Sequence, residues 1–126
     1  MKYGIIGCGM MGQEHIRNIA LVPDAVVSDV YDPVPELAQE CANLAGGAMV
    51  HDSLASLVRA VDAVVIVSPN HMHLDQLEEI ATIRHIPILC EKPLYTDATM
   101  ARRVADFEAA YTAPVWVAME YRYMPP

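Results

Sequence analysis

Residues 1–12 read Met1-Lys-Tyr-Gly-Ile-Ile-Gly-Cys-Gly-Met-Met-Gly12, and this stretch decides the fold. A short apolar run leads into Gly7, Gly9 and Gly12, which have the spacing G-x-G-x-x-G. In a dinucleotide-binding turn the first glycine permits a tight strand-to-helix turn, and the second lets a pyrophosphate approach the backbone. The third glycine lets the helix pack close to the strand. A helical pattern follows from about Met10, so free N–H groups and the positive end of the helix dipole are predicted to face an anion.

The remainder of the chain alternates short apolar or β-branched runs with helical patterns. Further strands are predicted at residues 25–31, 48–51, 62–67, 86–90 and 114–119. Helices are predicted at residues 10–21, 35–43, 54–60 and 74–84, and from a cap at Thr96 or Asp97 to about residue 111. The run DAVVIV at 62–67 is typical of a central parallel strand that is covered on both faces.

This alternation predicts an α/β fold with a doubly wound, parallel six-stranded sheet in the order 3-2-1-4-5-6 and helices on both faces. Ligands of such sheets bind at the carboxyl ends of the strands, near the point where the strand order reverses. We expect residues 1–119 to form one dinucleotide-binding domain. Residues 120–126 are expected to be an extended segment that begins a linker.

Composition excludes several classes of partner. The chain of 126 residues is long enough for one domain with a real core, and 54% of its residues are apolar. Its 8 basic and 16 acidic residues give a net charge of −8, which speaks against nucleic acid or an anionic membrane as a partner. Three cysteines without a C-x-x-C pair favour free thiols in a reducing cytoplasm.

Two histidines raise the question of a metal site. His71 and His73 are two residues apart, which on a strand would place both on one face. They lie instead at a predicted turn that opens a helix, and no carboxylate or cysteine cluster accompanies them. We therefore expect no bound metal.

Asp32 follows the second predicted strand and lies 20 residues after Gly12. A carboxylate at this position can accept hydrogen bonds from the adenosine ribose hydroxyls, and it repels a 2′-phosphate. An alternative interpretation is a helix N-cap, because an aspartate before Pro33 is also a good helix start. No arginine follows Asp32, so the sequence favours NAD over NADP.

The turn Ser68-Pro69-Asn70 falls at the carboxyl end of the fourth predicted strand. That edge of the sheet faces the cofactor, so we expect the backbone of this turn and Asn70 to line the nicotinamide side. The alternative is an ordinary proline turn with an Asx cap.

Glu91-Lys92-Pro93 lies at the carboxyl end of the fifth predicted strand. A lysine held beside a cofactor can donate a hydrogen bond to a substrate oxygen or take part in proton transfer. Glu91 can act electrostatically on that lysine or hold the cofactor amide. The alternative is a surface Lys–Glu pair at a strand end that Pro93 terminates, and the residues alone do not separate the two interpretations.

Taken together, the glycine turn, Asp32, S-P-N-x-x-H, E-K-P and the terminal Y-R-Y-x-P resemble the glucose-fructose oxidoreductase / inositol dehydrogenase / MocA family over essentially the whole chain. The resemblance implies an NAD(P)-dependent oxidoreductase that acts on a sugar, a polyol or a related compound. It implies that Lys92 assists catalysis and that the Lys92–Pro93 bond is a candidate cis peptide. The expected cofactor-binding residues are Gly7, Cys8, Gly9, Met10, Met11, Gly12, Asp32, Ser68, Pro69, Asn70, His73, Glu91 and Lys92.

The sequence departs from the family pattern in two places. The usual glycine before the fifth strand is absent, and Arg84-His85-Ile86-Pro87 replaces a shorter link. The sequence therefore does not predict the path of that loop. We expect His15 and His85 to be surface or half-buried helix residues. Relatives also continue past Arg122 into a second domain that supplies a histidine to the substrate site. The present chain is therefore expected to bind NAD(H) but to turn over little.

Two other functions compete with the oxidoreductase. A non-catalytic dinucleotide-binding sensor or regulatory module would share the glycine turn, but it would not need Lys92 beside Glu91. An S-adenosylmethionine enzyme also has a glycine-rich first turn, and it fits poorly with the S-P-N and E-K-P segments. Apolar surface around Trp116 and the tail allows a homo-oligomer.

Overall fold

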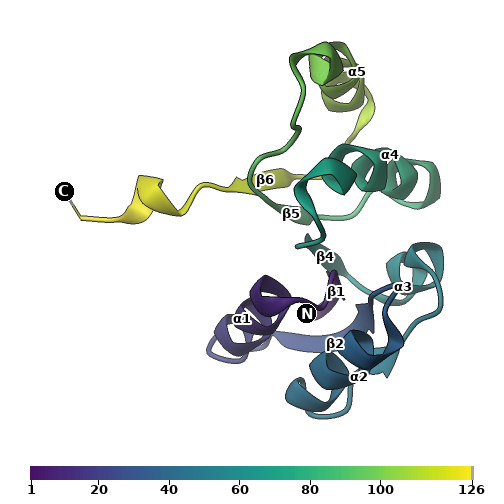
Figure 1. The fold of residues 1–126 in the computed structure, drawn as a ribbon, viewed down its shortest axis with the longest axis vertical. Helices are drawn as coiled ribbons and strands as arrows, with labels where there is room; N and C mark the ends of the chain where they lie inside the picture. The colour runs from purple at the N-terminus through teal and green to yellow at the C-terminus, as the bar shows by residue number, and fades with distance from the viewer. Residues whose placement is uncertain (126) are drawn as a thin grey trace.

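The computed structural model describes residues 1–125, and its centre is a six-stranded parallel sheet (Figure 1). The strands are β1 (Lys2–Ile6), β2 (Val26–Tyr31), β3 (Met49–Val50), β4 (Ala63–Ile66), β5 (Ile88–Glu91) and β6 (Val115–Ala118). Their order is β3-β2-β1-β4-β5-β6, which confirms the predicted order. The switch point therefore lies between β1 and β4, where the carboxyl ends of both strands meet.

Five α-helices connect the strands, together with three short 3₁₀ turns. The helices are α1 (Met10–Ile19), α2 (Pro35–Leu44), α3 (Leu54–Ala60), α4 (His73–Ile83) and α5 (Ala101–Ala110). The 3₁₀ turns are η1 (Asn70–Met72), η2 (Ala98–Met100) and η3 (Glu120–Tyr123). No helix within residues 1–125 is both long and apolar enough to span a bilayer.

Each face of the sheet has its own apolar core. Helices α1 and α2 cover one face, where Ile16 and Cys41 pack against β1, β2 and β4. Helices α3 and α4 cover the other face, where Leu57 and Leu77 are fully buried, and Phe107 of α5 packs at its edge. All four residues of β4 are buried, as the run of apolar residues predicted.

Several boundaries differ from the predicted ones. Strand β3 has only two residues, β5 begins two residues later than expected and includes Glu91, and α1 ends at Ile19. The expected extended tail is wrong for Glu120–Tyr123, which form the 3₁₀ turn η3, while Pro126 lies outside the described residues. The tail projects from β6 away from the body of the domain (Figure 1), and Trp116 on that edge strand is 56% exposed.

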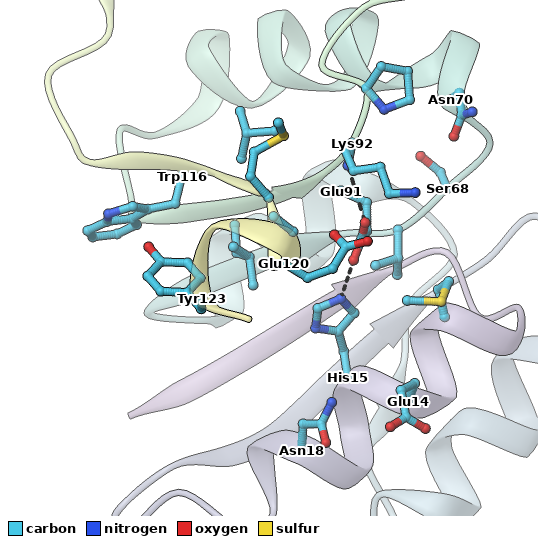
Figure 2. A pocket seen from close by; sticks show the side chains of 17 residues that line it. Glu14, His15, Asn18, Ser68, Asn70, Glu91, Lys92, Trp116, Glu120 and Tyr123 are labelled. Carbon is cyan, nitrogen blue, oxygen red and sulfur yellow. Dashed lines mark hydrogen bonds and ion pairs between the residues drawn. The ribbon is translucent and has the colours of Figure 1, made fainter. Parts of the chain in front are cut away.

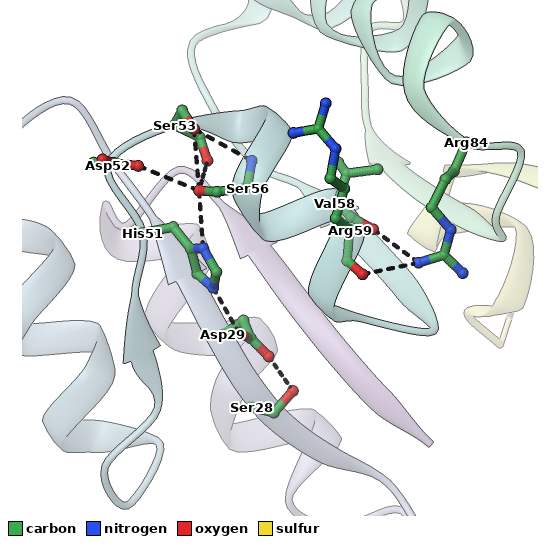
Figure 3. A network of polar contacts seen from close by, with 9 residues as sticks. All are labelled: Ser28, Asp29, His51, Asp52, Ser53, Ser56, Val58, Arg59 and Arg84. Atoms are coloured by element: carbon green, nitrogen blue, oxygen red, sulfur yellow. Dashed lines mark hydrogen bonds and ion pairs between the residues drawn. The ribbon is translucent and has the colours of Figure 1, made fainter.

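The loop before β5, whose path the sequence left open, is held by side chains rather than by a glycine. The Arg84 guanidinium donates hydrogen bonds to the carbonyl oxygens of Val58 at 3.1 Å and Arg59 at 3.3 Å, at the carboxyl end of α3 (Figure 3). His85 is exposed and stacks on Tyr111, with ring centroids 4.5 Å apart. The loop thereby contacts both the carboxyl end of α3 and the end of α5, and these side-chain contacts fix its path.

A second polar network ties the short strand β3 to its neighbours. His51 Nε2 lies 2.6 Å from Asp29 Oδ1, and His51 Nδ1 lies 2.9 Å from Ser56 Oγ (Figure 3). Ser28 donates a further hydrogen bond to Asp29. Asp29 is a buried carboxylate in β2, so the His51 ring provides the polar partner that its burial requires.

Candidate functional site

The glycine turn between β1 and α1 is built around close backbone contacts. Gly7 has φ +100°, and a Cβ on it would lie 2.6 Å from the backbone nitrogen of Ser68. A Cβ on Gly12 would collide with the carbonyl oxygen of Gly7. Gly9 is different, because a Cβ there would meet nothing within 4 Å. Two glycines are thus needed by the fold itself, whereas Gly9 leaves open space above the turn.

The amino end of α1 is open toward that space. Gly9 is the N-cap residue and has no side-chain capping bond, and the first turn of α1 contains no acidic residue. The first N–H groups of a helix lack intrahelical partners, and the helix dipole adds positive potential at the same place. The arrangement fits a bound phosphate or pyrophosphate.

Asp32 connects the glycine turn to the end of β2. Its Oδ2 accepts a hydrogen bond from the Cys8 N–H at 2.7 Å, and its Oδ1 accepts one from the Val34 N–H at 2.8 Å. The N-cap of α2 is Val34 and not Asp32, so the helix-cap alternative does not describe this carboxylate. Backbone donors hold the Asp32 side chain in place while it remains half-exposed at the sheet edge.

A cavity of about 730 Å³ lies on the β2 side of the turn. Gly7, Gly9, Met10 and Met11 line it from the turn, together with Asp32 and the apolar side chains of Val34, Leu37 and Leu54. Its charged lining residues are all acidic: Asp32, Asp52, Asp75 and Glu79. The shape and polarity suit an adenosine, whose flat base packs on apolar side chains and whose ribose hydroxyls donate to a carboxylate.

A second cavity, of about 700 Å³, lies on the β5–β6 side and meets the first at Met11, Val67 and Ser68 (Figure 2). Asn70, Glu91, Lys92 and Pro93 line it from the carboxyl ends of β4 and β5. The peptide bond between Lys92 and Pro93 is cis, as the resemblance implied. Figure 2 shows Lys92 extending on the side of the cavity where Ser68 and Asn70 lie. The structure thus brings the S-P-N and E-K-P segments to one cavity.

Three of the expected cofactor-binding residues, Cys8, Gly12 and His73, line neither cavity. His73 is fully buried. Its Nδ1 lies 2.7 Å from the carbonyl oxygen of Pro93, and its Nε2 lies 2.9 Å from that of Ser68. His73 therefore links the S-P-N segment to the E-K-P segment inside the protein and does not face either cavity.

The sequence did not single out His15, although the structure places it inside the site. Its Nε2 lies 2.8 Å from Glu91 Oε1, and the two side chains are 15% and 13% exposed (Figure 2). His15 follows Met11 by four residues, so both lie on the same face of α1. The four-residue spacing from Met11 is the signal in the sequence that could have placed His15 beside the site. Its partner Glu91 is 76 residues away, so the sequence could not identify the pair.

The thiols near the site are structural. Cys8, Cys41 and Cys90 are all free and buried. Burial raises the pKa of Cys8 well above its ordinary value, with a smaller contribution from neighbouring Cys41. Burial also raises the pKa of Cys90 to about 12. Neutral buried thiols of this kind are unreactive, so Cys8 contributes its backbone to the turn and a small side chain to the core.

Comparison with known proteins agrees with this geometry. Residues 1–119 match the GFO/IDH/MocA family model, described as an oxidoreductase family with an NAD-binding Rossmann fold. The rhizopine catabolism protein MocA of Rhizobium meliloti is 35% identical over 127 residues, which span 98% of this chain and 39% of that protein. An inositol 2-dehydrogenase of Streptomyces avermitilis is 39% identical over 108 residues, which span 83% of this chain and 31% of the enzyme.

A solved structure gives the same result in three dimensions. The myo-inositol dehydrogenase of Lactobacillus casei, in complex with NAD(H) and myo-inositol, superposes with a TM-score of 0.90 at 29% identity. The match covers 98% of this chain and 38% of that one, so the chain spans between 31% and 39% of the length of these three relatives. The chain belongs to the glucose-fructose oxidoreductase / inositol dehydrogenase / MocA family of oxidoreductases, of which it represents the NAD-binding Rossmann domain.

Proposed function

We propose that the chain is the NAD(H)-binding part of an oxidoreductase that acts on a hydroxyl group of inositol, a sugar or a related polyol. One observation carries the proposal: two cavities meet at the amino end of α1, with Asp32 in one and Lys92 in the other. An elongated ligand with a central diphosphate and two different ends fits this arrangement. The relatives that bind or act on inositol support the substrate class.

The chain's own residues suit the cofactor. Gly9 leaves space for the diphosphate above free N–H groups, and Asp32 lines the cavity proposed for the adenosine ribose. The nicotinamide, when bound, supplies hydride transfer. Lys92 lies where its ammonium can donate to the substrate oxygen and hold the proton that this oxygen gains or loses. Ser68, Asn70 and Glu91 orient the groups around it.

Several parts of the proposal concern the whole protein. We propose that residues 120–126 begin the connection to a further domain, because the relatives are longer by about the length of one. Residues of that domain would complete the substrate site. The three unpaired thiols favour a reducing compartment such as the cytoplasm.

Cofactor binding can be tested on the chain as it is. Trp116 is the single tryptophan of the sequence and lines the second cavity, on the β5–β6 side, which we call the nicotinamide-side cavity. Bound NADH should therefore quench Trp116 emission by energy transfer and gain fluorescence of its own. We expect saturable binding with a Kd below about 1 mM, within the usual range of enzyme substrates. Absence of both signals at several millimolar NADH would overturn the proposal.

Catalysis is tested in the full-length protein with a panel of polyols and sugars. Lys92→Ala should lower kcat by about 100-fold or more, because general acid–base groups contribute that much, while the NADH affinity changes little. Unchanged turnover in Lys92→Ala would refute its role. Absence of any polyol-dependent turnover in the wild-type protein, with NADH still bound, would favour the non-catalytic sensor.

A further inference from the structure

The pair formed by His15 and Glu91 lies at the nicotinamide-side cavity, and neither the glycine motif nor the E-K-P motif accounts for it. His15 belongs to α1, the helix whose amino end forms the phosphate cradle. Glu91 is the last residue of β5 and directly precedes Lys92. The pair therefore joins the helix of the diphosphate site to the strand that carries the lysine.

Both oxygens of the Glu91 carboxylate are held. Oε1 lies 2.8 Å from His15 Nε2, and Oε2 accepts a hydrogen bond from the Lys92 backbone N–H at 3.2 Å. A carboxylate that is only 13% exposed needs such partners, because burial without them is costly. If the ring of His15 were removed, Glu91 would lose its fixed orientation, and so would the peptide that it holds at Lys92.

The other charged groups of the cavity do not replace this contact. These charged residues are Glu14, Lys92 and Glu120. Within residues 1–125, His15 is the side chain that bonds to the Glu91 carboxylate, and Glu14 is paired with Arg17 on the exposed side of α1. Figure 2 shows the His15 ring directed at the Glu91 carboxylate, with a dashed line for their contact.

We propose that His15 is a positioning residue, which acts through Glu91 to fix the nicotinamide end of the site relative to the diphosphate cradle. The proposal rests on the function proposed above. It predicts that His15 matters for a ligand that carries a nicotinamide and not for one that lacks it. A residue needed only for the fold would affect both ligands alike.

The test compares the binding of NADH and of ADP-ribose, which lacks the nicotinamide ring, to the 126-residue chain by calorimetry. In His15→Leu the NADH affinity should fall about tenfold, the expected effect of losing one hydrogen bond to a charged group, while the ADP-ribose affinity stays within about twofold of wild type. In His15→Gln, whose side-chain amide nitrogen can reach the position of Nε2, NADH affinity should be largely retained. His85→Leu, which removes an exposed ring at the far end of β5, should bind both ligands as the wild type does.

A double-variant cycle keeps the test valid where one variant folds poorly. If His15 acts through Glu91, the variant His15→Leu/Glu91→Leu should bind NADH no more weakly than Glu91→Leu alone. Equal losses for NADH and ADP-ribose in His15→Leu, or additive losses in the double variant, would overturn the inference and leave the proposed function intact. Failure of the wild-type chain to bind either ligand would overturn the proposed function and the inference with it.

Discussion

Replacing Gly9 by alanine should separate folding from cofactor binding more cleanly than any other change in the glycine turn. A Cβ at Gly9 meets nothing within 4 Å, and the backbone there has φ −73° and ψ −165°, which alanine adopts without strain. A Cβ at Gly12 instead collides with the Gly7 carbonyl oxygen. That oxygen belongs to a turn fixed by the Gly7 N–H bond to Tyr31 at 2.9 Å, so it has little room to move.

These geometries give different stabilities for the two variants. In Gly9→Ala, the lower entropy of the unfolded chain adds about 0.4–1 kcal/mol, and loss of a favourable N-cap residue removes a similar amount. The free energy of unfolding should therefore stay within about 1 kcal/mol of wild type. In Gly12→Ala, the collision is with a backbone oxygen, so overpacking should cost ~2–3 kcal/mol, the upper part of its usual range, against about 1 kcal/mol that alanine adds as a helix former. Its melting temperature should fall by roughly 4–8 °C, at about 4 °C per kcal/mol for a chain of this length.

Cofactor binding should show the opposite order, with Gly9→Ala weakening it more than Gly12→Ala. The open space above Gly9 is where the diphosphate must approach, so the alanine methyl group should cost ~1–3 kcal/mol of binding, or about 5- to 150-fold in Kd. Thermal unfolding followed by circular dichroism measures the first effect, and Trp116 quenching by NADH measures the second. Gly9→Ala that binds NADH as tightly as wild type would refute the placement of the diphosphate at this turn.

The remaining predictions concern specificity, stability and assembly. NADPH should bind at least about tenfold more weakly than NADH, because a 2′-phosphate would face Asp32 in an acidic cavity; equal affinities would contradict this role. His51→Ala should lower the free energy of unfolding by at least about 2 kcal/mol in a denaturant titration, since Asp29 would stay buried with a lost partner, and an unchanged midpoint would refute it. The raised pKa of Cys90 stabilises the fold below the ordinary thiol pKa, and this contribution is lost as pH rises toward about 12. Stability should thus fall above roughly pH 9 and fall less in Cys90→Ala, and identical alkaline profiles would count against it. The exposed apolar side chains of β6 and the tail predict self-association, which light scattering would contradict by showing a monomer throughout.

The sequence predicted the fold because its signals are local. The glycine turn, the apolar run of β4 and the alternation of strands with helices each depend on nearby residues, and right-handed crossovers then leave few topologies. The positions of Asp32 and Lys92 were predictable for the same reason, because each directly follows a strand and so lies at the carboxyl edge of the sheet; their roles stay predictions. Boundaries shifted by one or two residues at strand and helix ends, as at β3 and at the end of α1, and the conformation of the tail was predicted wrongly.

The contacts that complete the site could not be predicted in this way. His15 lies in the middle of α1 and His73 opens α4, yet the sequence does not show that His15 bonds to Glu91 at the cavity or that His73 is buried between Ser68 and Pro93. These contacts depend on which strand lies opposite each helix turn, and only the assembled sheet determines that. The Asp29–His51 pair has the same origin, because its two residues are 22 apart in the chain and meet only where β2 and the end of β3 lie side by side.

The central claim is that one dinucleotide spans both cavities across the amino end of α1. A crystal structure of the chain with NADH tests it most directly. We expect the adenosine ribose at Asp32, the diphosphate above Gly9, and the nicotinamide in the cavity lined by Glu91 and Lys92. A cofactor bound with its ends reversed, or bound away from the glycine turn, would contradict it.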